Sequence, residues 1–321
     1  MTLTQLEYII AVDNFRHFQL AAEKCFITQP TLSMQIQKLE EEQGITIFDR
    51  SKKPVEPTSA GRKFIEQARV VLNESEKLKE IVKNKRGVVE GEFKLGIIPT
   101  IIHDLLPLFL KDLVIEYPNI ELIIEELQTE VILDKLKNGL LDGAILSTPL
   151  VEKGIKEITL YYEPFMAYVH PDHKFFDVEV IDPNELNMEE VLLLNRGHCF
   201  RNQVINLCST KFGQRKDLDQ PVKFESGNFE TLKKLVDQGF GLTLLPYLLA
   251  LDIKDPEIRA RLKPFKVPSP RREISMVFTR VQLKKNIINA ICEKVKQSVP
   301  KGLLTNDESM IVEPLLKPEV K

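Results

Sequence analysis

The fold of the first part of this chain is decided by the stretch Ala21-Ala-Glu-Lys-Cys-Phe-Ile-Thr-Gln-Pro-Thr-Leu-Ser-Met-Gln-Ile-Gln-Lys-Leu-Glu40. A helical pattern over Phe18–Lys24 breaks at residues 26–28, and Pro30 then fits the first turn of a new helix with Thr28 as its N-cap. That helix runs to about Gln43 and gathers one apolar face from Leu32, Ile36 and Leu39. Two short helices joined by a tight turn, after a first helix over residues 4–13, predict a helix-turn-helix.

The second helix of the pair has a polar face of amide, hydroxyl and amine side chains, which suit base edges and phosphates. Gly44 ends this helix, and the run from Ile47 to Thr58 predicts a short hairpin, or wing. Residues 50–63 carry five Lys and Arg side chains against only Glu56, so the wing is locally basic. We predict DNA contacts at Gln29, Pro30, Thr31, Ser33, Gln35, Lys38, Arg50, Lys52 and Lys53.

This part of the chain closely resembles the LysR-type transcriptional regulators. The resemblance runs through residues 21–40, Phe48-Asp-Arg50 and Pro57-Thr-Ser-Ala-Gly61. It implies a winged helix-turn-helix over residues 1–58 that binds a double-stranded DNA operator. The next residues repeat apolar side chains at helical spacing, and a long amphipathic helix of this kind usually pairs with a copy of itself. We therefore assign residues 59–88 to a dimerising linker helix, as the family has.

Strands alternate with helices from residue 91 onward, which predicts an α/β fold with a parallel sheet. Ligands of such sheets lie beyond the carboxyl ends of the strands, and Thr100 and Thr129 each stand at such an end. Either threonine could instead only cap its helix. Crossings near residues 163 and 266 fit the LysR effector domain, which is two-lobed and similar in plan to periplasmic binding proteins. We expect lobe I at 89–163 and 267–300, lobe II at 164–266, and a loosely held tail at 301–321.

Two cysteines, Cys199 and Cys208, bracket a segment with the apolar spacing of a helix. His198 and Arg201 would place cationic groups or donors beside the first sulfur, which predicts a lowered pKa for the Cys199 thiol. Nine residues of helix rise about 13 Å, whereas a disulfide needs Cα atoms within about 7 Å. The two sulfurs could therefore join only if this segment unwinds. Spacing alone leaves two unrelated thiols as the alternative.

The effector part resembles the peroxide-sensing OxyR branch of the LysR family. The matching pieces are Gly96–Thr100, Gly197–Gln203 with Cys208, Glu230–Gly239 and Pro270–Arg272. The resemblance implies that Cys199 is the peroxidatic thiol and Cys208 the resolving thiol, joined by a disulfide after oxidation. It also implies a peroxide pocket formed by Thr100, Thr129, His198, Arg201 and Arg272. Asn202 departs from the Asp usual in that branch, which puts the rate of reaction in doubt.

The same resemblance implies partners but neither a cofactor nor a metal. A regulator of this branch binds operator DNA as a homodimer or homotetramer, responds to hydrogen peroxide, and acts with RNA polymerase. A thioredoxin- or glutaredoxin-type reductant would reset it. Two other classes stay open: a LysR-type regulator that binds a small metabolite between the lobes, with incidental cysteines, and a thiol peroxidase attached to a DNA-binding domain.

Composition limits these possibilities. The chain has 321 residues, a formal net charge of −3 and four Cys. No apolar run approaches the roughly 20 residues of a membrane span, and the first residues lack the pattern of a signal peptide, so we expect a cytoplasmic protein without membrane contact. In a reducing cytosol a disulfide would be transient or redox-sensing. The Cys and His spacings match no zinc site.

Overall fold

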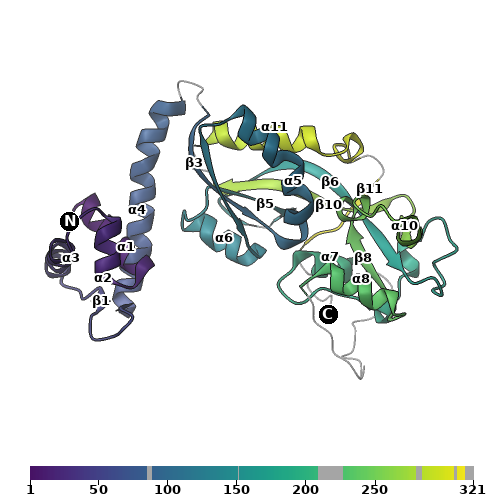
Figure 1. Ribbon diagram of the computed structural model, residues 1–321, viewed down its shortest axis with the longest axis horizontal. Coiled ribbons are helices and arrows are strands. Elements are labelled where there is room, and N and C mark those ends of the chain that lie inside the picture. Colours follow the sequence, from purple (N-terminus) through teal and green to yellow (C-terminus); the bar gives the residue numbers. More distant parts are fainter. Residues whose placement is uncertain (85–88, 151, 209–226, 280–283, 307–308, 315–321) are drawn as a thin grey trace. The chain divides into compact units, whose positions relative to one another are not determined.

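The structure is a computed structural model that describes residues 1–84, 89–150, 152–208, 227–279, 284–306 and 309–314 (Figure 1). Residues 85–88 of the expected linker and 315–321 of the expected tail lie outside this description. The chain divides into two compact units, an N-terminal one formed mainly by the residues before Val89 and a C-terminal one formed mainly by the residues from Val89 onward. Each unit has its own hydrophobic core.

Three short helices form the N-terminal unit: α1 (Leu3–Phe15), α2 (Phe18–Lys24) and α3 (Gln29–Gln43). Thr28 is the N-cap of α3 with Pro30 in its first turn, and Gly44 closes the helix in the left-handed conformation. The apolar faces of the three helices meet in one core that includes Leu6, Ile9, Leu32, Ile36 and Leu39. The predicted helix-turn-helix is confirmed.

The wing and the following helix pack onto this core. The wing is a hairpin of β1 (Phe48–Asp49) and β2 (Glu56–Pro57), and α4 spans Ser59–Asn84. Gly61 lies so close to the wing that a Cβ atom there would stand 2.0 Å from the carbonyl oxygen of Ile47, so only glycine fits. Ile65 and Ala68 are buried in the helix-turn-helix core. The first turns of α4 therefore serve the DNA-binding unit itself.

Lobe I of the C-terminal unit is an α/β layer structure built on the strand order β4-β3-β5-β10-β6. The first three strands are parallel, and β10 runs antiparallel to both β5 and β6. The strands are β3 (Gly91–Ile97), β4 (Ile120–Glu126), β5 (Gly143–Thr148), β6 (Ile155–Val169) and β10 (Ser269–Thr279). The helices are α5 (Pro99–Glu116), α6 (Thr129–Lys137) and α11 (Lys285–Ser298).

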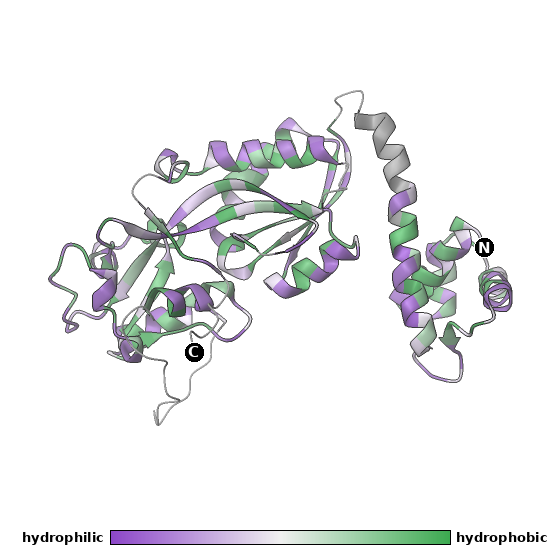
Figure 2. Ribbon diagram, turned by 180° about the vertical axis from the view of Figure 1, so that it is seen from behind, coloured by the Kyte–Doolittle hydropathy of each residue, from purple (hydrophilic) through white to green (hydrophobic). Residues whose placement is uncertain are grey.

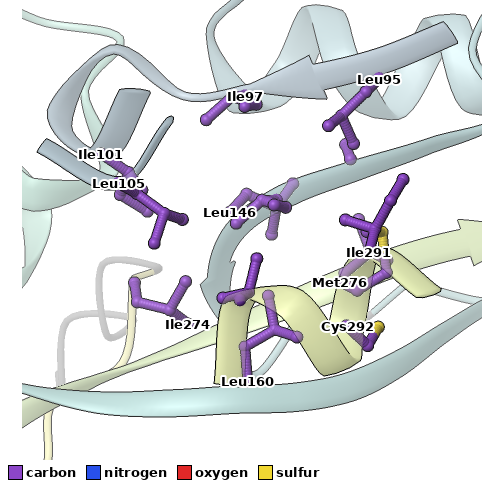
Figure 3. Close-up of a cluster of buried hydrophobic side chains, with 14 of the residues drawn as sticks. Leu95, Ile97, Ile101, Leu105, Leu146, Leu160, Ile274, Met276, Ile291 and Cys292 are labelled. Atoms are coloured by element: carbon purple, nitrogen blue, oxygen red, sulfur yellow. The ribbon is translucent and has the colours of Figure 1, made fainter. Parts of the chain in front are cut away.

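Alternation along the strands decides which helix covers which face of this sheet. Leu95 and Ile97 point to the side where α5 and α11 pack, and Figure 3 shows them gathered there with Leu146 and Met276. A Cβ atom on the intervening Gly96 would meet side chains of the opposite side, including one from α6. In Figure 2 the helices carry both hydrophilic and hydrophobic residues, as amphipathic surface helices do.

Lobe II begins at the second half of β6, where this strand pairs with β8 instead of β10. Its sheet continues through β7, parallel to β8, and β9 pairs with β6. Its core is separate from that of lobe I. Its elements are β7 (Val191–Leu192), α7 (Cys199–Cys208), α8 (Phe229–Asp237), β8 (Leu242–Pro246), α9 (Tyr247–Leu251), α10 (Pro256–Ala260), β9 (Leu262–Lys263) and the 3-10 turns Pro183–Glu185 and Met188–Glu190.

The expectation of a loosely held tail after residue 300 was wrong for its described part. After a 3-10 turn at Lys301–Leu303, the strand β11 (Ser309–Ile311) pairs in parallel with the start of β10. Val312 donates its N–H to the carbonyl of Arg271 at 2.8 Å and is buried in the core of lobe II. The segment has too few residues for a periodic signal, so its strand forms through pairing with β10 rather than through its own pattern.

Candidate functional site

The two cysteines occupy the first and last positions of α7, and both are buried free thiols. Nine residues of helix separate their Cα atoms by about 13 Å along the axis, so the helix keeps the sulfurs apart. They also belong to different cores, because Cys199 packs into the core of lobe I and Cys208 into that of lobe II. The helix predicted between the two cysteines is confirmed.

A buried arginine, Arg272 on β10, lies beside the first cysteine and holds the start of α5. Its Nη1 donates to Thr100 Oγ1 and its Nη2 to the carbonyl of Thr100, each at 3.0 Å. On its other side, Nε and Nη2 reach Glu163 Oε2 at 2.8 and 2.7 Å. The guanidinium carbon stands 5.0 Å from the centre of the Phe200 ring, the residue after Cys199. Arg272 thus connects the start of α5 in lobe I with α7 in lobe II.

Thr129 and His198 complete the surroundings of the Cys199 thiol. Thr129 begins α6, and its buried Oγ1 completes no hydrogen bond of ordinary geometry within the described residues. The hydroxyl nevertheless lies near enough to Cys199 to favour the thiolate. His198 is buried, and burial lowers the pKa of its imidazole despite the opposing charge of Glu126. The ring is therefore neutral at pH 7 and offers one N–H donor rather than a cation.

The prediction of a lowered pKa for Cys199 was wrong. Burial raises the pKa of this thiol, and the opposing effects of Arg272 and of the nearby Thr129 hydroxyl are smaller. His198 is not charged at neutral pH, and Arg201 directs Nη1 to the carbonyl of Leu194 at 2.8 Å. The sequence neighbours of Cys199 therefore gave the wrong direction for its pKa, because the effect of desolvation is larger than that of nearby donors and charges.

Burial of Cys199 predicts slow alkylation at neutral pH. At pH 7 we expect iodoacetamide to modify Cys199 at least about tenfold more slowly in the reduced folded protein than in the urea-unfolded chain, because the thiolate is disfavoured. The rate should climb as the pH rises through the folded-state pKa, which lies above the ordinary value. Mass spectrometry of the alkylated peptides measures this. A pH midpoint lower in the folded protein than in the unfolded chain would contradict it.

Sequence reasoning missed two carboxyl groups near this site. Glu163 is buried on β6 and accepts the N–H of Leu248 as well as the bonds from Arg272. Asp104 on α5 has a pKa raised to about 6, first by burial and then by the charge of Glu163. For Glu163 the sequence did offer a signal, because this carboxylate lies inside the apolar run that ends with Val169. A charged side chain buried in a strand is normally paired, so its position predicts a cationic partner.

Residues 309–314, here called the C-terminal segment, are hydrogen-bonded to α7. Gln203 Nε2 donates to the carbonyl of Val312 at 2.7 Å and to Ser147 Oγ at 3.1 Å. Asn206 Nδ2 donates to the carbonyl of Glu313 at 3.0 Å. Unwinding of α7 must therefore break two bonds to the C-terminal segment as well as the helix's own hydrogen bonds.

Replacing Val312 with Pro should loosen α7. Proline has no N–H, so the variant loses the bond from residue 312 to Arg271 and shifts the carbonyls that α7 uses. We expect amide exchange in α7 to accelerate about tenfold, the effect of one lost hydrogen bond, in hydrogen–deuterium exchange. Glu313→Ala is the matched control, because it keeps the carbonyl and removes only an exposed side chain. Equal protection of α7 in V312P and the parent would refute the role of the segment.

A cavity of about 750 Å³ opens between the lobes at the start of α5. Thr100, His103 and Asp104 line it from lobe I, and Phe229, Lys233 and Leu249 from lobe II. Its wall includes Thr100, which Arg272 holds, so the cavity adjoins the buried arginine.

No helix among the described residues is both long and apolar enough to span a membrane.

The residues predicted to meet DNA lie on α3 and the wing. Gln29, Pro30, Thr31, Lys38, Lys52 and Lys53 are exposed. Arg50 is held in place, since its Nη2 pairs with Glu40 at 2.9 Å and its Nη1 donates to Ser33 Oγ at 3.2 Å. Gln35 is half-buried and accepts a bond from Gln5. The structure presents these side chains on one unit, and their contacts with DNA stay a prediction.

Family models match nearly the whole chain. The model described as bacterial regulatory helix-turn-helix protein, lysR family, matches residues 3–62, and the one described as LysR substrate binding domain matches residues 86–299. The chain belongs to the LysR family of DNA-binding bacterial transcriptional regulators.

Relatives within that family include peroxide-responsive activators. The hydrogen peroxide-inducible genes activator of Dickeya chrysanthemi is 35% identical, with 87% of this chain and 89% of the relative covered. The dual regulator OxyR of Escherichia coli K12 is 34% identical over the same shares. Full-length OxyR C199D from Pseudomonas aeruginosa is a solved structure with 32% identity and a TM-score of 0.77, covering 93% of this chain and 99% of that one.

Proposed function

We propose that this protein is a transcriptional regulator that responds to hydrogen peroxide by oxidation of Cys199. The observation that carries the proposal is a buried thiol beside Arg272 and Thr129, at one end of a helix whose other end is a second free thiol. Relatives at 34–35% identity over most of their length are named as activators of hydrogen peroxide-inducible genes. The sensor needs one oxidation per signal rather than repeated turnover.

In the proposed reaction, the Cys199 thiolate attacks one oxygen of hydrogen peroxide. An S–O bond forms as the O–O bond breaks, and the departing hydroxide takes a proton to become water, which leaves a sulfenic acid. A donor on Nη1 of Arg272 stabilises the departing oxygen, as preorganised donors do in other sites. The Cys208 sulfur then displaces the sulfenic hydroxyl as water, and the Cys199–Cys208 disulfide forms once α7 unwinds.

The disulfide would hold a second arrangement of lobe II that alters the assembly and its spacing on DNA. The proposal includes a homodimer or homotetramer on operator DNA, contact with RNA polymerase, a cytoplasmic location, and reduction by a thioredoxin- or glutaredoxin-type protein. The proposal assigns Thr100, Thr129, His198 and Arg272 to the peroxide pocket. Arg201 supports the pocket by holding the loop before α7.

Thiol mapping tests the proposal directly. Brief treatment of the reduced protein with near-stoichiometric peroxide should yield a Cys199–Cys208 linked peptide in mass spectrometry. Cys199→Ser should remove the linked peptide and leave DNA binding by the reduced protein intact, and Cys292→Ala is the matched control, since it removes another buried thiol. The proposal fails if Cys199 stays reduced while fold and DNA binding persist.

The interlobe cavity favours a second candidate function. At about 750 Å³ it is far larger than a peroxide molecule needs and suits a small metabolite. A regulator of this kind would keep its ligand response in Cys199→Ser and would be stabilised against heat by the ligand. The same variant therefore separates the two candidates.

A further inference from the structure

We propose that Glu163 is a positioning residue for the reaction of Cys199, because it orients the guanidinium of Arg272 and balances its charge. Glu163 and Arg272 are opposite one another on β6 and β10, the strands that connect the lobes. Each side chain is 1% exposed. The inference rests on the proposed peroxide reaction, but its central claim concerns the charge at the Cys199 thiol and can be measured without peroxide.

The orientation follows from the hydrogen-bond pattern. A guanidinium has five N–H groups. Glu163 accepts the Nε–H and forms an ion pair with Nη2, while Thr100 accepts one N–H of Nη2 and one of Nη1. Within the described residues this leaves a single N–H, on Nη1, for an oxygen of a bound reactant. A guanidinium without Glu163 could rotate and offer a different edge.

Glu163 is itself fixed, so it can hold its partner. Its Oε1 accepts the N–H of Leu248, at the start of α9 in lobe II, at 2.9 Å. Its Oε2 accepts the Nε–H of Arg272 and lies 2.7 Å from Nη2, and Arg272 in turn holds Thr100 at the start of α5 in lobe I. The pair is therefore a link between the two lobes as well as a support for the thiol.

Charge balance follows from the same contacts. Arg272 is the strongest nearby charge that favours the Cys199 thiolate. Under this proposal, the carboxylate of Glu163, which contacts that cation and is shielded from water, offsets most of its effect on the thiolate. The other titratable groups around the pair are Asp104 on α5, Tyr161 on β6 and His198 before α7. None of them carries a positive charge at pH 7 that would take over the role of Arg272.

The test is the pH profile of Cys199 alkylation by iodoacetamide in the reduced full-length chain. Glu163→Gln keeps an oxygen acceptor but removes the charge, and should move the midpoint down by about one unit, which raises the rate at pH 7 about tenfold. Glu157→Gln is the matched control, since Glu157 lies on the same strand and accepts one backbone N–H but does not touch Arg272. An unchanged midpoint in folded E163Q overturns the proposal.

A second variant keeps the test decisive if E163Q does not fold. The double variant E163Q/R272Q removes both charges, so balanced charges predict a midpoint within about half a unit of the parent. A rise of about one unit or more would show that Arg272 acts as an unbalanced cation and would overturn the proposal. Because no peroxide is used, a failure of the sensor function appears separately, as Cys199 that alkylates as expected but resists peroxide.

Discussion

Replacing Arg272 with Met is expected to destabilise the C-terminal unit by about 3–5 kcal/mol, the cost of removing one partner of a buried ion pair. Among the residues that the structure describes, the substitution leaves the buried carboxylate of Glu163 with the N–H of Leu248 as its one remaining partner. It also leaves Thr100 Oγ1 without the donor that holds the start of α5. Urea unfolding followed by circular dichroism measures the loss.

Two further variants identify the cause of this loss. In the double variant R272M/E163Q the uncompensated charge disappears, so about half of the lost stability should return. Arg271→Met is the matched control, because the half-buried Arg271 side chain forms one hydrogen bond within the described residues, from Nη1 to the carbonyl of Thr305, and it should cost less than about 1 kcal/mol. If R272M and R271M lose equal stability, the buried pair does not stabilise the unit.

Sequence reasoning could find the elements whose signals are local. Leu32, Ile36 and Leu39 are spaced within one helix, and their period predicted a face that the structure buries. The segment between Cys199 and Cys208 was likewise predicted to be helical from its apolar positions, and the structure shows that the helix begins and ends at these two residues. In both cases the residues that decide the structure lie within a few turns of one another.

The rest of the site depends on pairing between distant parts of the chain. Glu163 and Arg272 are 109 positions apart and meet only through the register of β6 on β10. The pKa of Cys199 depends on burial by residues from both lobes, so His198 and Arg201, its neighbours in sequence, gave the wrong sign. The strand β11 exists only because β10 offers it a partner. No local sequence pattern predicts this ion pair, this pKa shift or this strand pairing.

Oxidation of the protein to the Cys199–Cys208 disulfide is expected to remove hydrogen-exchange protection from α7 by about 100-fold or more. The reason is geometric, because about 13 Å of helical rise must shrink to the distance of about 7 Å or less that a disulfide allows. Unwinding also breaks the bonds from Gln203 and Asn206 to the C-terminal segment. Mass-spectrometric exchange on the reduced and oxidised protein measures the change.

A matched variant separates unwinding from oxidation itself. Cys208→Ser treated with peroxide should stop at a Cys199 sulfenic acid, detectable with a dimedone probe, and should keep the protection of α7 because no bond pulls the ends together. The core contacts of Phe200, whose ring centre lies 5.1 Å from that of Phe165 and 5.2 Å from that of Phe229, favour the intact helix until the second sulfur reacts. A linked peptide found together with full protection of α7 would show that the sulfurs meet by another route. The switch would then have to lie outside this helix.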